Sequence, residues 1–230
     1  MKYSYWMDDI STKNIDVLLV WLSFSTGIID ATTYAFFNVF VSNMTGNVTF
    51  LALAVSQLHM DSISAPNSVI AMVSFCAGIS ISGQLGHVFG NERRWWLFTT
   101  LMAQSLLVVV AVILTSTMRF DASNTKTLGL LVPLAMSYGA QAATSRGLGI
   151  TEIPTVNITG AMIDLFLDKS VFKLANRPRN RRAAFILALF AGASIGGLTA
   201  RKVNCQVALA VAAAVKLVAA FEILFIPTKS

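Results

Sequence analysis

The chain has 230 residues, of which 55% are hydrophobic and only 12% are charged. Soluble domains carry about 25% charged residues, so this composition excludes an ordinary soluble domain and indicates a polytopic membrane protein. Lys and Arg outnumber Asp and Glu by 17 to 11. These cations cluster beside apolar stretches, where they act as orientation signals and contact anionic lipid, so the lipid bilayer is the expected partner and nucleic acid is not.

Residues 1–14 are predicted to form a short interfacial segment. Asp8 and Asp9, together with the length of the next apolar run, do not fit a secretory signal. Six long apolar stretches follow, each about the 20 residues that a bilayer core demands of a helix. They are 16–38, 67–89, 95–117, 127–146, 183–201 and 204–226.

Two further apolar segments, 46–58 and 159–168, are too short for a full span and are typical of re-entrant or broken helices. The predicted fold class is therefore an all-α integral membrane protein with about six transmembrane helices and two short re-entrant or broken helices. No cofactor and no metal site is predicted.

The distribution of cations predicts the orientation. With the N-terminus inside and only the six long stretches crossing, twelve Lys and Arg residues fall on the cytoplasmic side and four on the other. If both short segments also crossed, the division would be eleven against five. The positive-inside rule thus favours six spans with both termini cytoplasmic, and we expect a multi-pass protein of the bacterial inner (plasma) membrane.

A short signature occurs twice, 114 positions apart: Asn43-Met44-Thr45-Gly46 returns as Asn157-Ile158-Thr159-Gly160. The apolar stretches before and after it also repeat, which predicts one membrane domain made of two halves, 15–118 and 127–226. Three spans in each half would make the halves inverted repeats, whereas four would make them parallel. We favour inverted repeats, which bring broken elements face to face near the middle of the membrane.

Each signature is predicted to be a helix start inside the protein. Ser, Asn and Thr are strong N-cap residues, and glycine permits turns that other residues avoid. Backbone N–H groups at such a start suit an anion or a carboxylate. The alternative is a pair of interface turns that cap short surface helices.

Asp30 lies within the first long stretch, where a carboxylate is costly and usually faces a bundle interior or a water path. We predict a role in proton or ion coupling. The alternative is a carboxylate near the outer interface, bonded to Thr32, Thr33 or Tyr34. The matching position in the second half is Ala142, with Gln141 beside it.

The predicted substrate or ion pathway combines Asp30 with the polar residues of both signatures. Its residues are Asp30, Ser42, Asn43, Thr45, Gly46, Asn47, Gln141, Asn157, Thr159 and Gly160. No catalytic residue is predicted, because the chain has no phosphate loop, G-x-S-x-G elbow or HExxH motif.

Two other patterns concern packing and lipid contact. Small residues recur every four positions at Gly78, Ser82, Gly86 and Gly90, and at Gly192 and Gly196. This spacing favours close helix contact within the chain, with a homo-oligomer left open. The cation-rich stretch 169–182, interrupted by Pro178, is predicted to be a cytoplasmic loop that anchors the topology, with lipid head-group binding as the alternative.

The element Gly27-Ile28-Ile29-Asp30-Ala31, followed about a dozen residues later by Ser42-Asn43-Met44-Thr45-Gly46-Asn47, resembles the YoaK-type family of bacterial and fungal membrane proteins. The second half fits through Gly139-Ala140-Gln141 and the stretch 155–160. The resemblance implies about six spans and supplies neither a substrate nor catalytic residues.

The predicted function is a small secondary carrier or channel for a small solute, with an anion among the candidates and proton coupling at Asp30. The first alternative is a membrane scaffold, sensor or accessory subunit, which predicts a dry interface between the two breaks. The second is an intramembrane enzyme that modifies lipids, which requires a clustered acid, base and nucleophile.

Overall fold

The computed structural model describes residues 3–56, 64–117 and 126–229, and these residues form helices joined by turns and short loops. The prediction of an all-helical membrane protein is confirmed. The elements, in chain order, are α1 (Tyr3–Met7), η1 (Thr12–Asn14), α2 (Asp16–Phe37), α3 (Met44–Val55), α4 (Ala65–Phe89), α5 (Arg94–Thr117), α6 (Lys126–Gly147), α7 (Ile158–Phe166), α8 (Arg177–Lys202) and α9 (Cys205–Glu222).

Among the described residues, five helices are long and apolar enough to cross a membrane: α2, α4, α5, α8 and α9. The predicted stretch 127–146 corresponds to α6, whose 22 residues fall within the range of lengths of these five helices but include no window as apolar as theirs. Its polar side chains, among them Ser137, Gln141 and Thr144, are buried against neighbouring helices. Helix α6 therefore lies inside the bundle, shielded from lipid, and forms the sixth long helix of the bundle.

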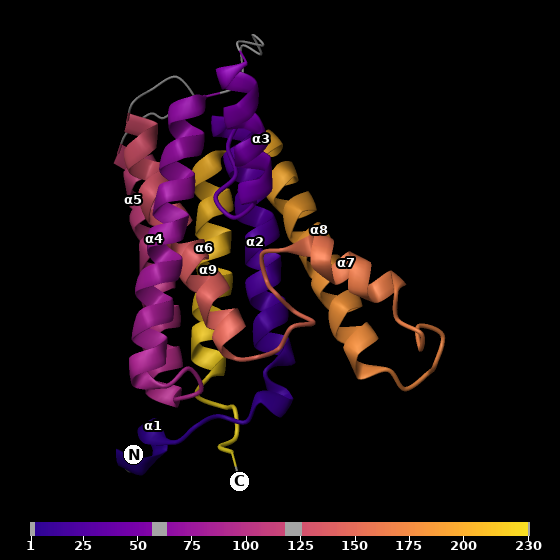
Figure 1. The fold of residues 1–230 in the computed structure, drawn as a ribbon. Helices are drawn as coiled ribbons and strands as arrows, with labels where there is room; N and C mark the ends of the chain where they lie inside the picture. The colour runs from indigo at the N-terminus through magenta and orange to yellow at the C-terminus, as the bar shows by residue number, and fades with distance from the viewer. Residues whose placement is uncertain (1–2, 57–63, 118–125, 230) are drawn as a thin grey trace.

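The long helices alternate in direction, so both termini lie at one end of the bundle (Figure 1). Helices α2, α5 and α8 run away from this end, whereas α4, α6 and α9 run toward it (Figure 1). Helices α3 and α7, which correspond to the two short predicted segments, have 12 and 9 residues. At 1.5 Å per residue they measure about 18 and 14 Å, too short to cross a hydrocarbon core of about 30 Å.

Glycines let two pairs of long helices touch through their backbones. A Cβ atom added to Gly27 of α2 would lie 2.1 Å from the Leu189 carbonyl oxygen of α8, and one on Gly192 of α8 would lie 2.0 Å from the Phe24 oxygen. Helices α4 and α6 meet in the same way through Gly78 and Gly139. Gly78 and Gly192 of the predicted small-residue pattern thus serve helix contact within the chain, whereas Gly90 ends α4 with φ at +92° and does not continue the packing face.

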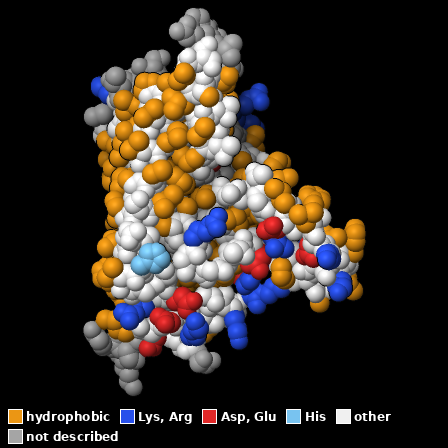
Figure 2. All heavy atoms as spheres, in the orientation of Figure 1, with side chains coloured by type: hydrophobic (Ala, Val, Ile, Leu, Met, Phe, Trp, Pro, Cys, Tyr) orange, Lys and Arg blue, Asp and Glu red, His pale blue; other side chains and the backbone are white. Residues whose placement is uncertain are grey.

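The outer surface is largely hydrophobic, and the charged side chains gather mostly at the end that carries the termini (Figure 2). Large apolar side chains such as Val73 of α4 and Phe190 of α8 are exposed. Exposed apolar side chains on long helices are what a lipid-facing surface requires.

The predicted interfacial segment at the N-terminus packs across the start of α5. Arg94 is fully buried there, and its guanidinium donates hydrogen bonds to the carbonyl oxygens of Ile223 at 2.6 Å and Ile226 at 2.7 Å. It also lies 4.2 Å from the ring centroid of Tyr5. Arg94 thereby satisfies carbonyl groups at and just beyond the C-terminal end of α9 and holds the two termini together.

The predicted loop 169–182 requires a correction, because α8 begins at Arg177 and Pro178 lies in its first turn. Proline is well suited to that position. Asn176 caps the helix by accepting a hydrogen bond from the Arg179 N–H at 3.0 Å. Arg177 and Arg181 pair with Asp16 at the start of α2, at 2.9 and 2.7 Å. These ion pairs explain why arginines that are typical of a loop in the sequence lie in the first turns of a helix.

Candidate functional site

Asp30 is tied to the segment that precedes α3. One carboxylate oxygen accepts hydrogen bonds from the backbone N–H groups of Val41 at 3.1 Å and Ser42 at 2.9 Å, and the other accepts one from the Ser42 hydroxyl. The expected alternative partners Thr32 and Thr33 bond to backbone carbonyl groups instead. A carboxylate with three donors is held in one orientation, so the α2 side chain fixes the position of the first break.

The first break is a capped helix start, as predicted. Asn43 is the N-cap of α3, and its side chain accepts a hydrogen bond from the Gly46 N–H at 3.3 Å. Gly46 itself is helical, so the expected role of a glycine turn is wrong at this position. The Phe40 ring lies only 2.8 Å from where a Cβ atom on Gly46 would stand. Close approach of this ring is therefore the reason for glycine.

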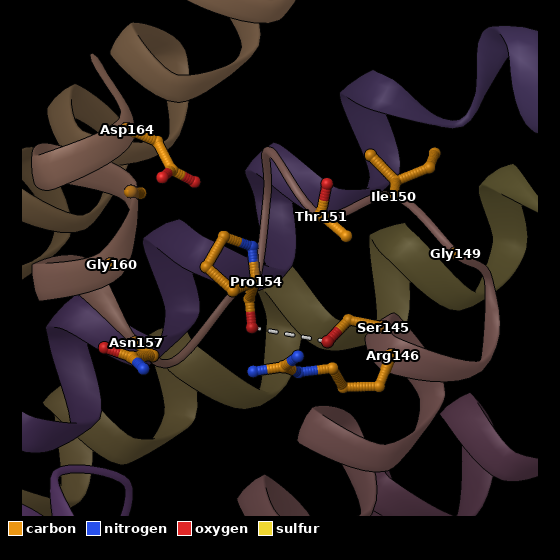
Figure 3. Close-up of a pocket in the computed structure, with 10 residues that line it drawn as sticks. Ser145, Arg146, Gly149, Ile150, Thr151, Pro154, Asn157, Gly160 and Asp164 are labelled. Atoms are coloured by element: carbon orange, nitrogen blue, oxygen red, sulfur yellow. Dashed lines mark hydrogen bonds between the residues drawn. The ribbon is translucent and has the colours of Figure 1, made fainter. Parts of the chain in front are cut away.

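The second break is fastened to the end of α6. Ser145 donates a hydrogen bond to the Pro154 carbonyl oxygen at 3.3 Å (Figure 3). Thr155 in turn donates one to the Ser145 hydroxyl at 3.3 Å. Thr155 carries the unusual backbone, with φ at +60°. Gly160 is helical, and a Cβ atom added there would meet nothing within 4 Å. The glycine-turn expectation is wrong here as well.

A cavity of about 860 Å³ lies between the two breaks. Asp30, the stretch 42–46 before and within α3, and the stretch 156–159 before and within α7 all line it. Seven of the ten predicted pathway residues are thus brought together in one place. They are Asp30, Ser42, Asn43, Thr45, Gly46, Asn157 and Thr159.

Three predicted residues lie elsewhere. Asn47 is buried and bonds to the Phe40 backbone, accepting from its N–H at 3.0 Å and donating to its carbonyl at 2.6 Å. Gln141 is buried and donates to the Thr26 hydroxyl at 2.9 Å, whereas its neighbour Ala142 lines the cavity. Gly160 lines an adjoining, smaller cavity.

The cavity residues that were not predicted include two with ionisable side chains, Arg146 and His87. His87 continues a series on one face of α4, since Phe75, Ile79 and Gly83 also line the cavity at four-residue intervals. Arg146 follows Ala142 by four residues on α6, and Ala142 is the match of Asp30. Arg146 could therefore have been found by extending the helix face from Ala142, whereas no residue of the His87 series was singled out in the sequence.

Arg146 also lines the smaller cavity of about 170 Å³, together with Asn157 and Asp164. Its guanidinium extends toward Pro154 and Asn157 (Figure 3). Within the described residues, no hydrogen bond or ion pair engages this guanidinium. Asp164, by contrast, pairs with Arg182 at 3.8 Å. The two cavities therefore adjoin at an exposed arginine whose charge is not neutralised by a neighbouring carboxylate.

The electrostatics of the larger cavity favour a negative ligand. Helices α3 and α7 both begin at its wall, where backbone N–H groups carry partial positive charge. The charge of Asp30 is already engaged by three hydrogen-bond donors. Arg146 remains available to a carboxylate or phosphate oxygen, for which its fork of donors is well suited.

Comparison with known proteins agrees with the motifs. The model of the family described as "Protein of unknown function (DUF1275)" matches residues 18–221, so the chain belongs to this family. It is 27% identical over 156 residues to the UPF0700 transmembrane protein YoaK of Bacillus subtilis (strain 168), covering 67% of each chain. The predicted YoaK-type resemblance is confirmed. No solved structure matches.

Proposed function

For this member of the DUF1275 family, we propose transport of a small anionic solute through the cavity between the two breaks. The observation that carries this proposal is that Asp30 and both breaks line one cavity of about 860 Å³. A scaffold, sensor or accessory subunit calls for a dry, packed interface at this place. A carrier or channel calls for a polar cavity, which is a better match to the residues in the wall.

Arg146 supports the choice of an anion. A cation on a cavity wall with no ion-pair partner among the described residues attracts negative solutes and repels cations. The N-terminal ends of α3 and α7 act in the same direction. A solute with one carboxylate or phosphate group could bind to the Arg146 guanidinium and to the backbone N–H groups at the starts of α3 and α7.

Asp30 supports the proposed coupling. A carboxylate that gained a proton would hold the Val41 and Ser42 N–H groups more weakly, because the loss of charge weakens each hydrogen bond. Protonation would therefore loosen the first break where it lines the cavity. This links a proton or ion to the shape of the solute site.

We infer that the halves 15–118 and 127–226 are inverted repeats within one membrane domain. The glycine contacts come in matched pairs, with Gly27 and Gly192 joining α2 to α8, and Gly139 and Gly78 joining α6 to α4. In each half, the first long helix (α2 or α6) therefore packs against the helix that follows the break in the other half (α8 or α4). Corresponding helices also run in opposite directions (Figure 1), which is typical of carriers with inverted repeats.

The orientation of the protein in the membrane is inferred from the end of the bundle at which the cations lie. The end with both termini carries the cations of the α4–α5 turn and of the start of α8, including Arg93, Arg177 and Arg181. By the positive-inside rule we assign this end to the cytoplasm and the protein to the bacterial inner membrane.

The test is solute flux in proteoliposomes that contain the purified full-length protein. Acetate, succinate and inorganic phosphate serve as probes, with potassium as the cationic comparison. We expect uptake of at least one anion and a loss of about tenfold or more in Arg146→Gln. Arg201→Gln is the matched control. Arg201 is an exposed arginine in the last turn of α8, at the opposite end of the bundle from Arg146. Equal flux through both variants would remove Arg146 from the mechanism, and absence of anion uptake would overturn the proposal.

Coupling is tested with the same proteoliposomes under a pH gradient. Asp30→Asn retains an oxygen that can accept the Val41 and Ser42 N–H groups, but it cannot take up a proton. We expect the variant to lose the acceleration that a pH gradient gives to wild-type uptake. Unchanged acceleration would remove Asp30 from coupling while leaving anion transport in place.

A further inference from the structure

The loop between α7 and α8 presents its largest apolar side chains to the outside. Phe172 is 96% exposed and Leu174 is 97% exposed. The polar residue Asn176 of the same loop is buried. This is the reverse of the arrangement that water favours, since burial of apolar side chains stabilises a loop in solution.

The loop nevertheless has a defined fold, held by polar contacts at its centre. Asp168 accepts hydrogen bonds from the Ser170 N–H at 2.7 Å and from the Asn176 side chain at 2.8 Å. The Arg179 guanidinium donates to the carbonyl oxygens of Val171 at 2.6 Å and Lys173 at 2.8 Å. Because these contacts hold the backbone, Phe172 and Leu174 remain outside and available to an apolar medium.

Cations flank the exposed apolar pair. Lys169 and Lys173 are exposed, and within the described part of the chain their side chains have no hydrogen bond or ion pair. The nearby carboxylates are engaged, since Asp164 and Asp168 each lie 3.8 Å from Arg182. The loop projects from the bundle, and hydrophobic and basic side chains lie together there (Figures 1 and 2).

We propose that the loop 168–176 is an anchor that docks on the surface of a membrane rich in anionic phospholipid. Phe172 and Leu174 enter the region between head groups and acyl chains, and Lys169 and Lys173 bind phosphate groups of the lipids. Apolar side chains of the preceding segment, Phe166 and Leu167, are exposed as well and extend the apolar surface.

A second copy of the chain is a poorer occupant. A symmetric contact would bring the lysines of one loop against the same lysines of the other, and like charges at close range repel. Anionic lipid head groups instead complement these cations. The inference is independent of the transport proposal.

The experiment places an environment-sensitive fluorophore at Phe172→Cys in full-length protein whose two free cysteines are changed by Cys76→Ala and Cys205→Ala. The protein is reconstituted into phosphatidylcholine alone or into phosphatidylcholine mixed with phosphatidylglycerol. We expect quenching by nitroxide-labelled lipid, stronger with phosphatidylglycerol. In Lys169→Gln/Lys173→Gln this increase should be lost. Since residue 172 is almost fully exposed, labelling does not disturb packing.

Three outcomes would overturn the inference. Quenching by aqueous iodide, with none by labelled lipid, would place the loop in water. Equal quenching in both lipid mixtures would remove anionic lipid as the partner. Protection from both quenchers, with energy transfer between labelled copies that rises with protein density, would assign the loop to a contact between copies.

Discussion

Asp30 and Ser42 are joined through both oxygens of one carboxylate, because Ser42 donates its backbone N–H to one oxygen and its hydroxyl to the other. The contact connects the interior of α2 to the segment that precedes α3, twelve residues later. It thus combines two of the residues singled out in the sequence into one structural unit at the wall of the cavity.

Replacement of Asp30 by alanine is expected to destabilise the protein. It leaves the N–H groups of Val41 and Ser42 without their acceptor, and an unsatisfied buried donor costs about 1–3 kcal/mol. Asp30→Asn keeps an acceptor oxygen and should unfold close to the wild-type temperature. Thermal unfolding of purified protein in detergent measures both, and equal losses in the two variants would contradict the role of the acceptor oxygen.

The contact between α2 and α8 gives a second prediction. Gly27→Ala would place a Cβ atom 2.1 Å from the Leu189 carbonyl oxygen and force the two backbones apart. We expect a loss of about 1–3 kcal/mol in the free energy of unfolding, the usual range for overpacking. Measurement is by unfolding in mixed micelles of ionic and neutral detergent.

Gly197→Ala is the matched control for that experiment. Gly197 lies within α8, the helix against which Gly27 packs, but a Cβ atom there meets nothing within 4 Å. Alanine has the higher helix propensity, so this variant should be as stable as the wild type or slightly more so. A similar loss in both variants would show that the close contact with Leu189 is not the cause.

The sequence predicted the long helices well because length and apolar content are local properties that a bilayer selects directly. The start of α8 was placed six residues late, at 183 instead of Arg177. Its first turns are rich in arginine and contain Pro178. Arg177 and Arg181 are explained by their pairing with Asp16, which lies far away in the chain.

The candidate site was predicted less completely, for a physical reason. An amide side chain serves a cavity or a buried backbone equally well, and the sequence does not distinguish these cases. Asn157 lines the cavity, whereas Asn47 holds Phe40 and Gln141 holds Thr26. Arg146 was counted only among the cations that set the orientation, although it lies four residues after Ala142 on the same face of α6.

Lys216 gives a third prediction, since it is a buried cation whose contacts are neutral. Its ammonium group donates to the Ser137 hydroxyl at 2.8 Å and lies 4.0 Å from the ring centroid of Tyr138. We expect Lys216→Met to be as stable as the wild type or more stable, because it keeps the volume and removes the cost of desolvating a charge. Lys216→Ala should lose about 2 kcal/mol or more through the space that it leaves.

The comparison of these two variants also reports on function. If Lys216→Met unfolds like the wild type yet loses anion uptake, the charge of Lys216 acts in transport. A Lys216→Met variant that is much less stable than the wild type would contradict the prediction and assign a structural role to the contact with Ser137.

The loop between α7 and α8 gives a prediction about pH. A hydrogen bond from the Asn176 side chain, followed by one from the Ser170 N–H, lowers the pKa of Asp168 below its usual 3.8. Such a carboxylate stabilises the folded loop at every pH above its pKa in the unfolded state. This stabilisation is lost as the pH falls through its lower pKa in the folded state. We expect the anisotropy of a fluorophore at position 172 to be constant near neutral pH and to fall below about pH 4.

Asp168→Asn provides the control for this transition. The variant retains an oxygen for the Ser170 N–H but loses one of its two acceptors, so the Asn176 side chain keeps only the Ser170 carbonyl oxygen as an acceptor for its NH₂ group. Its anisotropy should be reduced at every pH and should show no transition in acid. If Asp168→Asn kept the wild-type transition, another acid, with Asp164 beside Arg182 as the nearest, would control the loop. A wild-type loop that stayed rigid well below pH 4 would show that the Arg179 contacts alone hold its backbone.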